Sequence, residues 1–90
     1  MKEIRVEIDN WRVGDFTIEK GVWADTVLRY MPRESMLKQP IILGKDDDGL
    51  VVEWWYLGVI FTLARATVRD TLFGDITAYG VQKIEELTYE

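Results

Sequence analysis

The sequence has no cysteine and no histidine among its 90 residues. The absence of cysteine excludes disulfide scaffolds and cysteine nucleophiles. The absence of both cysteine and histidine excludes zinc ribbons, and without histidine no catalytic triad or metal site can use imidazole. The seven glycines are isolated and form no phosphate-binding loop. Ser35 is the sole serine, and without histidine or cysteine it has no conventional activating base. We therefore expect no enzyme, no catalytic residues, no cofactor and no metal.

Long apolar stretches are also missing. The longest runs from Trp54 to Phe61, far short of the ~20 residues that a membrane-spanning helix needs. The first residues alternate between charged and apolar side chains, which is unlike the continuous apolar run of a signal peptide. These absences predict a soluble, cytoplasmic protein that makes no membrane contact.

Basic residues are few relative to acidic ones. The chain has 16 Asp and Glu against 11 Lys and Arg, a formal net charge of −5, and 48% of its residues are hydrophobic. The apolar fraction is enough for one small core, so we expect a single domain over residues 1–90. Phosphate binding relies on clustered Lys and Arg, so direct nucleic-acid binding is not expected.

The apolar spacing predicts five elements. Residues 2–8 alternate like a strand with one wet face, and residues 20–31 have the apolar spacing of a helix that ends before Pro32. The Asp-Gly step between two apolar runs indicates a β-hairpin around 46–49. Residues 57–72 fit a helix better than a long strand, although their β-branched residues favour the strand. Residues from 75 onward form a strand, with 81–89 either a continuation or a short helix.

These elements predict an α+β fold: a small two-layer domain with an antiparallel or mixed β-sheet packed against about two helices.

Two groups of carboxylates merit attention. Asp46, Asp47 and Asp48 are adjacent, so in an extended chain they point in alternating directions and do not chelate one ion easily. We interpret them as a solvated hairpin tip or a contact for a charged partner. Glu53, Asp70 and Asp75 are the acids that a histidine-free enzyme would use, but no spacing signature links them.

The run Glu53-Trp54-Trp55-Tyr56 is the strongest functional signal. On a strand, Trp55 faces opposite to Trp54 and Tyr56, so one large ring is expected on an outer surface. The sequence thus predicts a non-enzymatic, acidic protein-interaction module, an adaptor, inhibitor or assembly factor that covers a basic surface of its target. The alternative function is a small-ligand-binding domain with an aromatic pocket, and the second alternative is a histidine-free enzyme that uses carboxylates. The chain could also pair with a second copy of itself as a homodimer. The predicted partner-binding residues are Glu53, Trp54, Trp55, Tyr56, Asp46, Asp47 and Asp48.

Overall fold

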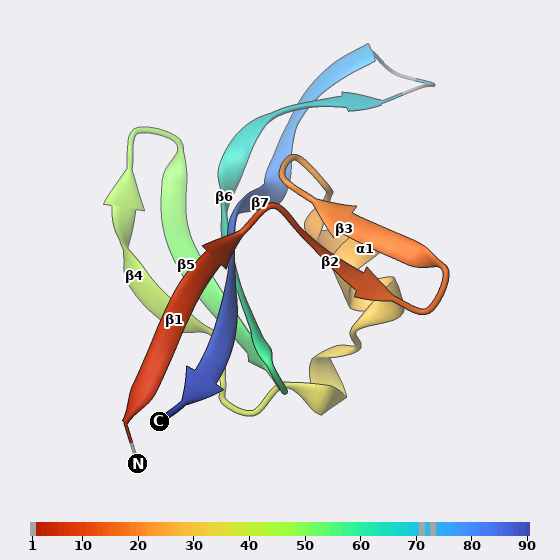
Figure 1. Ribbon diagram of the computed structural model, residues 1–90. Coiled ribbons are helices and arrows are strands. Elements are labelled where there is room, and N and C mark those ends of the chain that lie inside the picture. The colour runs from red at the N-terminus through yellow and green to blue at the C-terminus, as the bar shows by residue number, and fades with distance from the viewer. Residues whose placement is uncertain (1, 71, 73) are drawn as a thin grey trace.

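The body of the protein is a five-stranded antiparallel sheet (Figure 1). The computed structural model describes residues 2–70, 72 and 74–90. The strands follow the order β1-β7-β6-β5-β4, and they are β1 (Glu3–Ile8), β7 (Gly74–Tyr89), β6 (Val59–Asp70), β5 (Gly49–Tyr56) and β4 (Ile41–Asp46). A separate hairpin pairs β2 (Asn10–Val13) with β3 (Phe16–Glu19). The helix α1 (Ala24–Tyr30) and the 3-10 turn η1 (Arg33–Ser35) follow it.

The predicted packing of a sheet against two helices is wrong. The structure is mostly β, with 64% strand and 12% helical residues. Residues 59–70 of the predicted helix over 57–72 form the strand β6, residue 71 lies outside the described residues, and residues 81–89 continue β7 as a strand. The strand at 2–8, a helix within 20–31 and the hairpin around 46–49 are confirmed.

The helical spacing in β6 is misleading because residues 59–64 of this strand are buried on both sides. Val59, Phe61 and Leu63 face one side and are fully buried. Ile60 and Thr62 face the other side and are at most 7% exposed. A strand with two dry faces shows no alternation between polar and apolar residues, so its period cannot be read from the sequence.

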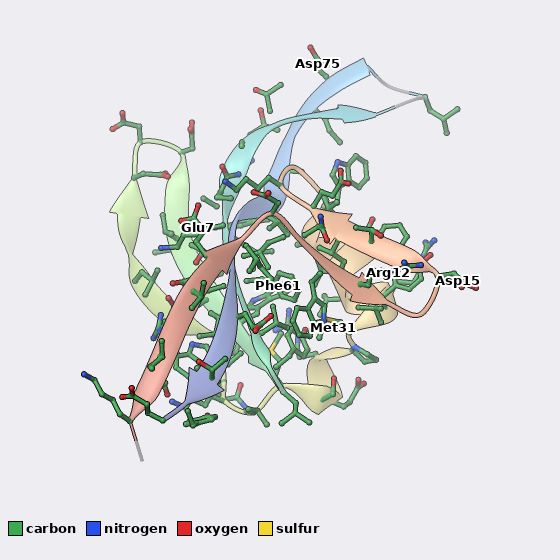
Figure 2. The ribbon with its side chains drawn as sticks, in the orientation of Figure 1. Glu7, Arg12, Asp15, Met31, Phe61 and Asp75 are labelled. Carbon is green, nitrogen blue, oxygen red and sulfur yellow. The ribbon has the colours of Figure 1, made fainter. Side chains whose placement is uncertain are left out.

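The main core lies between the sheet and the layer formed by α1 and the β2–β3 hairpin. We call this side of the sheet the helix face. Trp54 and Tyr56 of β5 and Phe61 of β6 pack there with Ile18 of β3 and Val27 of α1. Figure 2 shows Phe61 pointing into the space between these two layers.

A bulge in β7 keeps apolar residues on the helix face. Lys83 pairs with Thr62, but Val81 pairs with the next residue, Leu63, so Gln82 is an extra residue in the ladder. The extra residue puts both Val81 and Ile84 on the same side, where both are buried. Their spacing of three residues is the reason that the sequence of this strand also resembles a helix.

The opposite side of the sheet, which we call the Trp55 face, has a smaller core of Trp55, Ile60 and Leu87. Arg5 of β1 reaches Glu53 of β5 with a distance of 2.9 Å between Nη1 and Oε2, although β7 and β6 lie between these strands. In a flat sheet the two strands would be ~14 Å apart, at ~4.8 Å per strand. The reach of Arg5 therefore fits a sheet that curls toward the Trp55 face and shields it from solvent.

The β6–β7 hairpin extends beyond the rest of the sheet. The pairing between β5 and β6 ends at Val52 and Leu63, whereas β6 and β7 remain paired as far as Asp70 and Gly74. The result is a two-stranded arm that projects from the body in Figure 1.

Candidate functional site

The structure separates the predicted partner-binding residues into three places. Trp54 and Tyr56 are in the core of the helix face, and Glu53 and Trp55 are on the opposite face. The aspartates Asp46 to Asp48 lie at the exposed tip of the β4–β5 hairpin. The two tryptophans do point to opposite sides, as the alternation predicts. The expectation of an outer ring is wrong, however, because Trp54 is 6% and Trp55 4% exposed.

A network of charges fixes Glu53 on the Trp55 face. Its carboxylate accepts hydrogen bonds of 2.9 Å from Arg5 Nη1 and of 2.9 Å from Trp55 Nε1. Arg5 also lies 4.7 Å from the centre of the Trp55 ring, and the Lys38 ammonium lies 4.0 Å from it. Because its two oxygens are engaged, the Glu53 carboxylate is held as a structural group and is poorly placed to accept a substrate proton.

Asp75 lies far from Glu53 along the sheet. Asp75 pairs with Arg69 and Glu53 pairs with Thr62, so their levels on β6 differ by seven residues. At ~3.3 Å per residue this separation is ~23 Å. Figure 2 shows Asp75 near the outer end of the β6–β7 arm. The side chain of Asp70 lies outside the described part of the chain.

The pKa of the Tyr56 hydroxyl is shifted by its burial in the core. Burial raises the pKa of its hydroxyl to about 12, and the charge of Arg33 acts in the opposite direction. The hydroxyl is buried and has no hydrogen-bond partner among the described residues. Tyr56 therefore stays neutral near neutral pH, as a core residue.

The aspartates at the hairpin tip have unequal roles. Asp46 Oδ1 accepts hydrogen bonds from the backbone N–H of Asp48 at 2.9 Å and of Gly49 at 3.1 Å. This is the local turn that aspartate side chains favour. Gly49 has φ of +138°, a backbone region that other residues rarely adopt. The tip is thus shaped by Asp46 and Gly49, while Asp47 and Asp48 are exposed.

We expect Asp46→Ala to lower the free energy of unfolding by about 1 kcal/mol, because the two N–H groups lose their acceptor. Asp47→Ala is the matched control and should change it by less than ~0.5 kcal/mol, as surface substitutions usually do. Urea unfolding of both variants measures the difference. Equal values for the two variants would show that the turn does not depend on Asp46.

Exposed apolar side chains lie on the same hairpin. Ile42 and Leu43 of β4 are 62% and 51% exposed, and Leu50 of β5 is 42% exposed. β4 is an edge strand of the sheet, and edges with apolar side chains are prone to bind other chains. Sequence reasoning missed these residues. The signal was the run Ile41-Ile42-Leu43, which is apolar at every position and so does not alternate.

A groove opens between α1 and the sheet. Its volume is about 400 Å³, at the lower end of the ~300–1,000 Å³ typical of ligand pockets. Trp54 contributes to the lining although its ring is almost fully buried. Two charged residues, Asp25 and Arg33, also line it. The remaining lining residues are apolar or aromatic: Trp23, Ala24, Leu28, Pro40, Val52, Ala78 and Tyr79.

The described residues contain neither a cluster of metal ligands nor a membrane-spanning helix. They contain no group of three or more acidic side chains that could hold a metal ion. None of the helices in this part of the chain is long and apolar enough to cross a membrane.

Comparisons with protein-family models, with curated proteins and with solved structures find no match for this chain.

Proposed function

We propose that this protein is a non-enzymatic interaction module that binds a basic protein partner through the β4–β5 hairpin. The single observation that carries the proposal is the exposure of Ile42, Leu43 and Leu50 beside the carboxylates of the tip. We call these residues, Ile42, Leu43, Leu50 and Asp46 to Asp48, the hairpin surface.

Each part of the hairpin surface has a role in this proposal. Interfaces commonly combine an apolar centre with a polar rim. In this proposal Ile42, Leu43 and Leu50 form the apolar centre, and the aspartates of the tip form the rim. A net charge of −5 favours encounter with a positively charged surface and disfavours nucleic acid and anionic membranes. An adaptor, inhibitor or assembly factor that covers a basic target in the cytoplasm fits this description.

Catalysis has less support. The Glu53 carboxylate is engaged by Arg5 and Trp55, and Asp75 is on a distant part of the arm. A site that acts by acid–base chemistry needs two such groups close enough to share a substrate.

The proposal is tested by affinity capture from an extract of the native cell with three forms of the protein as bait. The partner should be recovered with the wild-type chain. The double variant Ile42→Ser and Leu43→Ser should bind about 30-fold more weakly or worse, since removal of a central apolar anchor costs ~2 kcal/mol or more. Leu57→Ser is the matched control, because Leu57 is 83% exposed but lies in the turn after β5, at the end of the strand that is far from the hairpin tip.

Recovery of the same partner by the double variant would contradict the proposal. A fourth bait with Asp47→Asn and Asp48→Asn tests the electrostatic part, because these changes leave the acceptor Asp46 in place. It should slow association and reduce its dependence on salt. If the captured partner is a second copy of the chain, light scattering will show a dimer that the double variant fails to form.

A further inference from the structure

The first strand forms the second edge of the sheet. β1 pairs with β7 along its whole length without a register shift, and among the described strands none lies on its other side. Four of its six residues are exposed, so this edge is open to solvent. The other edge, β4, has a bulge between Ile42 and Gly44, and bulges disfavour regular pairing with a further strand. β1 is therefore the edge that is regular enough to pair with another strand.

The pairing with β7 decides which backbone groups of β1 face the open edge. The Glu90 N–H donates to the Lys2 carbonyl at 2.9 Å, so Lys2 and Glu90 form a hydrogen-bonded pair. Hydrogen-bonded and non-hydrogen-bonded pairs alternate along an antiparallel ladder, so the even-numbered residues of β1 bond toward β7. The N–H and C=O groups of the odd-numbered residues, Glu3, Arg5 and Glu7, therefore point to the open edge.

Three antiparallel registers bring these odd-numbered residues of two copies opposite one another. With Arg5 at the two-fold axis, two arginines face each other, and like charges directly opposite are unfavourable. With Ile4 at the axis, Val6 of each copy faces Lys2 of the other and has no apolar partner. With Val6 at the axis, Val6 faces its own copy and Arg5 faces Glu7. The sequence of β1 is thus complementary to itself in the register centred on Val6.

The same register also matches the apolar side chains. Ile8 packs against the core of the helix face, so Ile4 and Val6 point to that side as well. Val6 is 50% exposed in a single copy. In the register centred on Val6, the two Val6 side chains meet at the axis and Ile4 of each copy faces Ile8 of the other. Pairing of two copies therefore removes apolar surface from water.

The charges around β1 are close to balanced. The charged side chains that contact one another on the Trp55 face beside this edge are Glu3, Arg5, Glu7, Lys20, Glu53, Lys83 and Glu85. Lys38, which lies over the Trp55 ring, adds a fourth cation to these three cations and four carboxylates. On the helix face Glu86 lies beside Val6. Three strand spacings of ~4.8 Å would separate the two copies of Glu86 by ~14 Å, beyond the Debye length of ~10 Å.

We propose that two copies of this protein associate through β1, with their β1 strands antiparallel around a two-fold axis at Val6. The two five-stranded sheets then form one continuous sheet of ten strands, with a hairpin surface at each far end. This association uses the opposite edge from the hairpin surface and does not depend on the proposed function. A dimer carries two hairpin surfaces, so it would bind a partner with repeated sites more strongly by avidity.

The first test uses single-cysteine variants, because the chain contains no cysteine of its own. At the axis, Val6 forms a non-hydrogen-bonded pair with its copy, for which the Cα–Cα distance is ~4.5 Å and allows a disulfide. Val6→Cys should therefore give a covalent dimer when it is oxidised with copper–phenanthroline. Ile4→Cys is the matched control, because it lies on the same side of β1 but four residues, or ~13 Å, from its copy in this register.

The second test measures the mass in solution by light scattering over a protein concentration series that reaches the millimolar range. The salt concentration is ~0.15 M, which screens the net charge of −5 on each copy. The mass of the wild-type protein should rise from 10.5 kDa toward twice this value. Val6→Lys should keep the mass of one chain, because two lysines would meet at the axis. If Val6→Lys does not fold, Glu7→Lys is a second variant, since it places cations opposite each other.

Leu43→Lys is the matched control for the mass measurement. Leu43 is 51% exposed, nearly the same as Val6, but lies on the other edge strand, so this variant should associate like the wild-type protein. A wild-type mass of one chain at every concentration overturns the proposal, and so does cross-linking of Ile4→Cys that equals or exceeds that of Val6→Cys. Loss of association in Leu43→Lys but not in Val6→Lys would place the second copy at the hairpin surface and also contradict it. The capture assay with the hairpin variants tests the proposed function separately.

Discussion

Replacing Arg5 with methionine should lower the free energy of unfolding by about 3 kcal/mol, near the lower end of the range for breaking a buried ion pair. Methionine keeps much of the apolar length of arginine but leaves the Glu53 carboxylate, which is 6% exposed, without its cation. The arginine side chain is 35% exposed, so solvent partly compensates and the upper end of the range is not expected. Urea or guanidinium unfolding at neutral pH measures the loss.

Two further variants show whether the loss comes from the stranded charge. Arg12→Met is the matched control, because Arg12 is an exposed arginine on β2, and it should change stability by less than ~0.5 kcal/mol. The double variant Arg5→Met and Glu53→Leu should recover most of the loss, since an apolar pair of similar volume replaces buried ion pairs well. A loss below ~1 kcal/mol for Arg5→Met would contradict a structural role for this pair.

Trp54→Ala and Trp55→Ala should each lower the free energy of unfolding by about 3–5 kcal/mol, as large-to-small substitutions of buried aromatic residues do. The sequence alone predicts that the two variants diverge, because one ring was expected on an outer surface. In the structure both rings are buried, Trp54 against Tyr56 and Phe61 and Trp55 against Ile60 and Leu87. A loss of this size is a large part of the stability of a domain of this length.

Trp55→Phe separates the packing of this ring from its hydrogen bond. Phenylalanine retains most of the apolar contacts but cannot donate to Glu53, so a loss of about 1–3 kcal/mol is expected. Leu57→Ala is the exposed control and should be close to neutral. A Trp55→Ala variant that is as stable as this control would show that the Trp55 face is not a second core.

The two buried cores, one on the helix face and one on the Trp55 face, restrict the surfaces that can bind a partner. Residues 59–64 of β6 and the neighbouring residues 53–56 of β5 are buried on both faces, so the aromatic run of the sequence stabilises the fold. Three of the exposed apolar side chains, Ile42, Leu43 and Leu50, lie close together on the edge strand β4 and at the start of β5, whereas the others lie elsewhere in the chain: Val6, Tyr30, Leu37, Leu57, Leu72 and Tyr89. An edge lacks a neighbouring strand on one side, which is why this part of the sheet is open to another chain.

Part of the fold could be predicted from local patterns. The alternation in residues 2–8 predicts β1 because successive side chains of a strand point to opposite sides, which separates Glu3, Arg5 and Glu7 from Ile4, Val6 and Ile8. The hairpin around 46–49 is predictable because its turn depends on Asp46 and Gly49, which are neighbours in the chain. The helix ends at Tyr30 close to Pro32, which cannot continue it.

The sequence by itself determined the composition-based exclusions, the first strand, the helix and the hairpin, because each of these depends on residues close together in the chain. Tertiary structure decided that 59–70 is a strand, since only the packing of two faces shows why Ile60 and Phe61 are both apolar. It also decided that Glu53 is held by Arg5, 48 residues away, across a curled sheet. The groove and the exposed hairpin side chains depend in the same way on which strand lies at the edge, and strand order is a long-range property that local patterns do not encode.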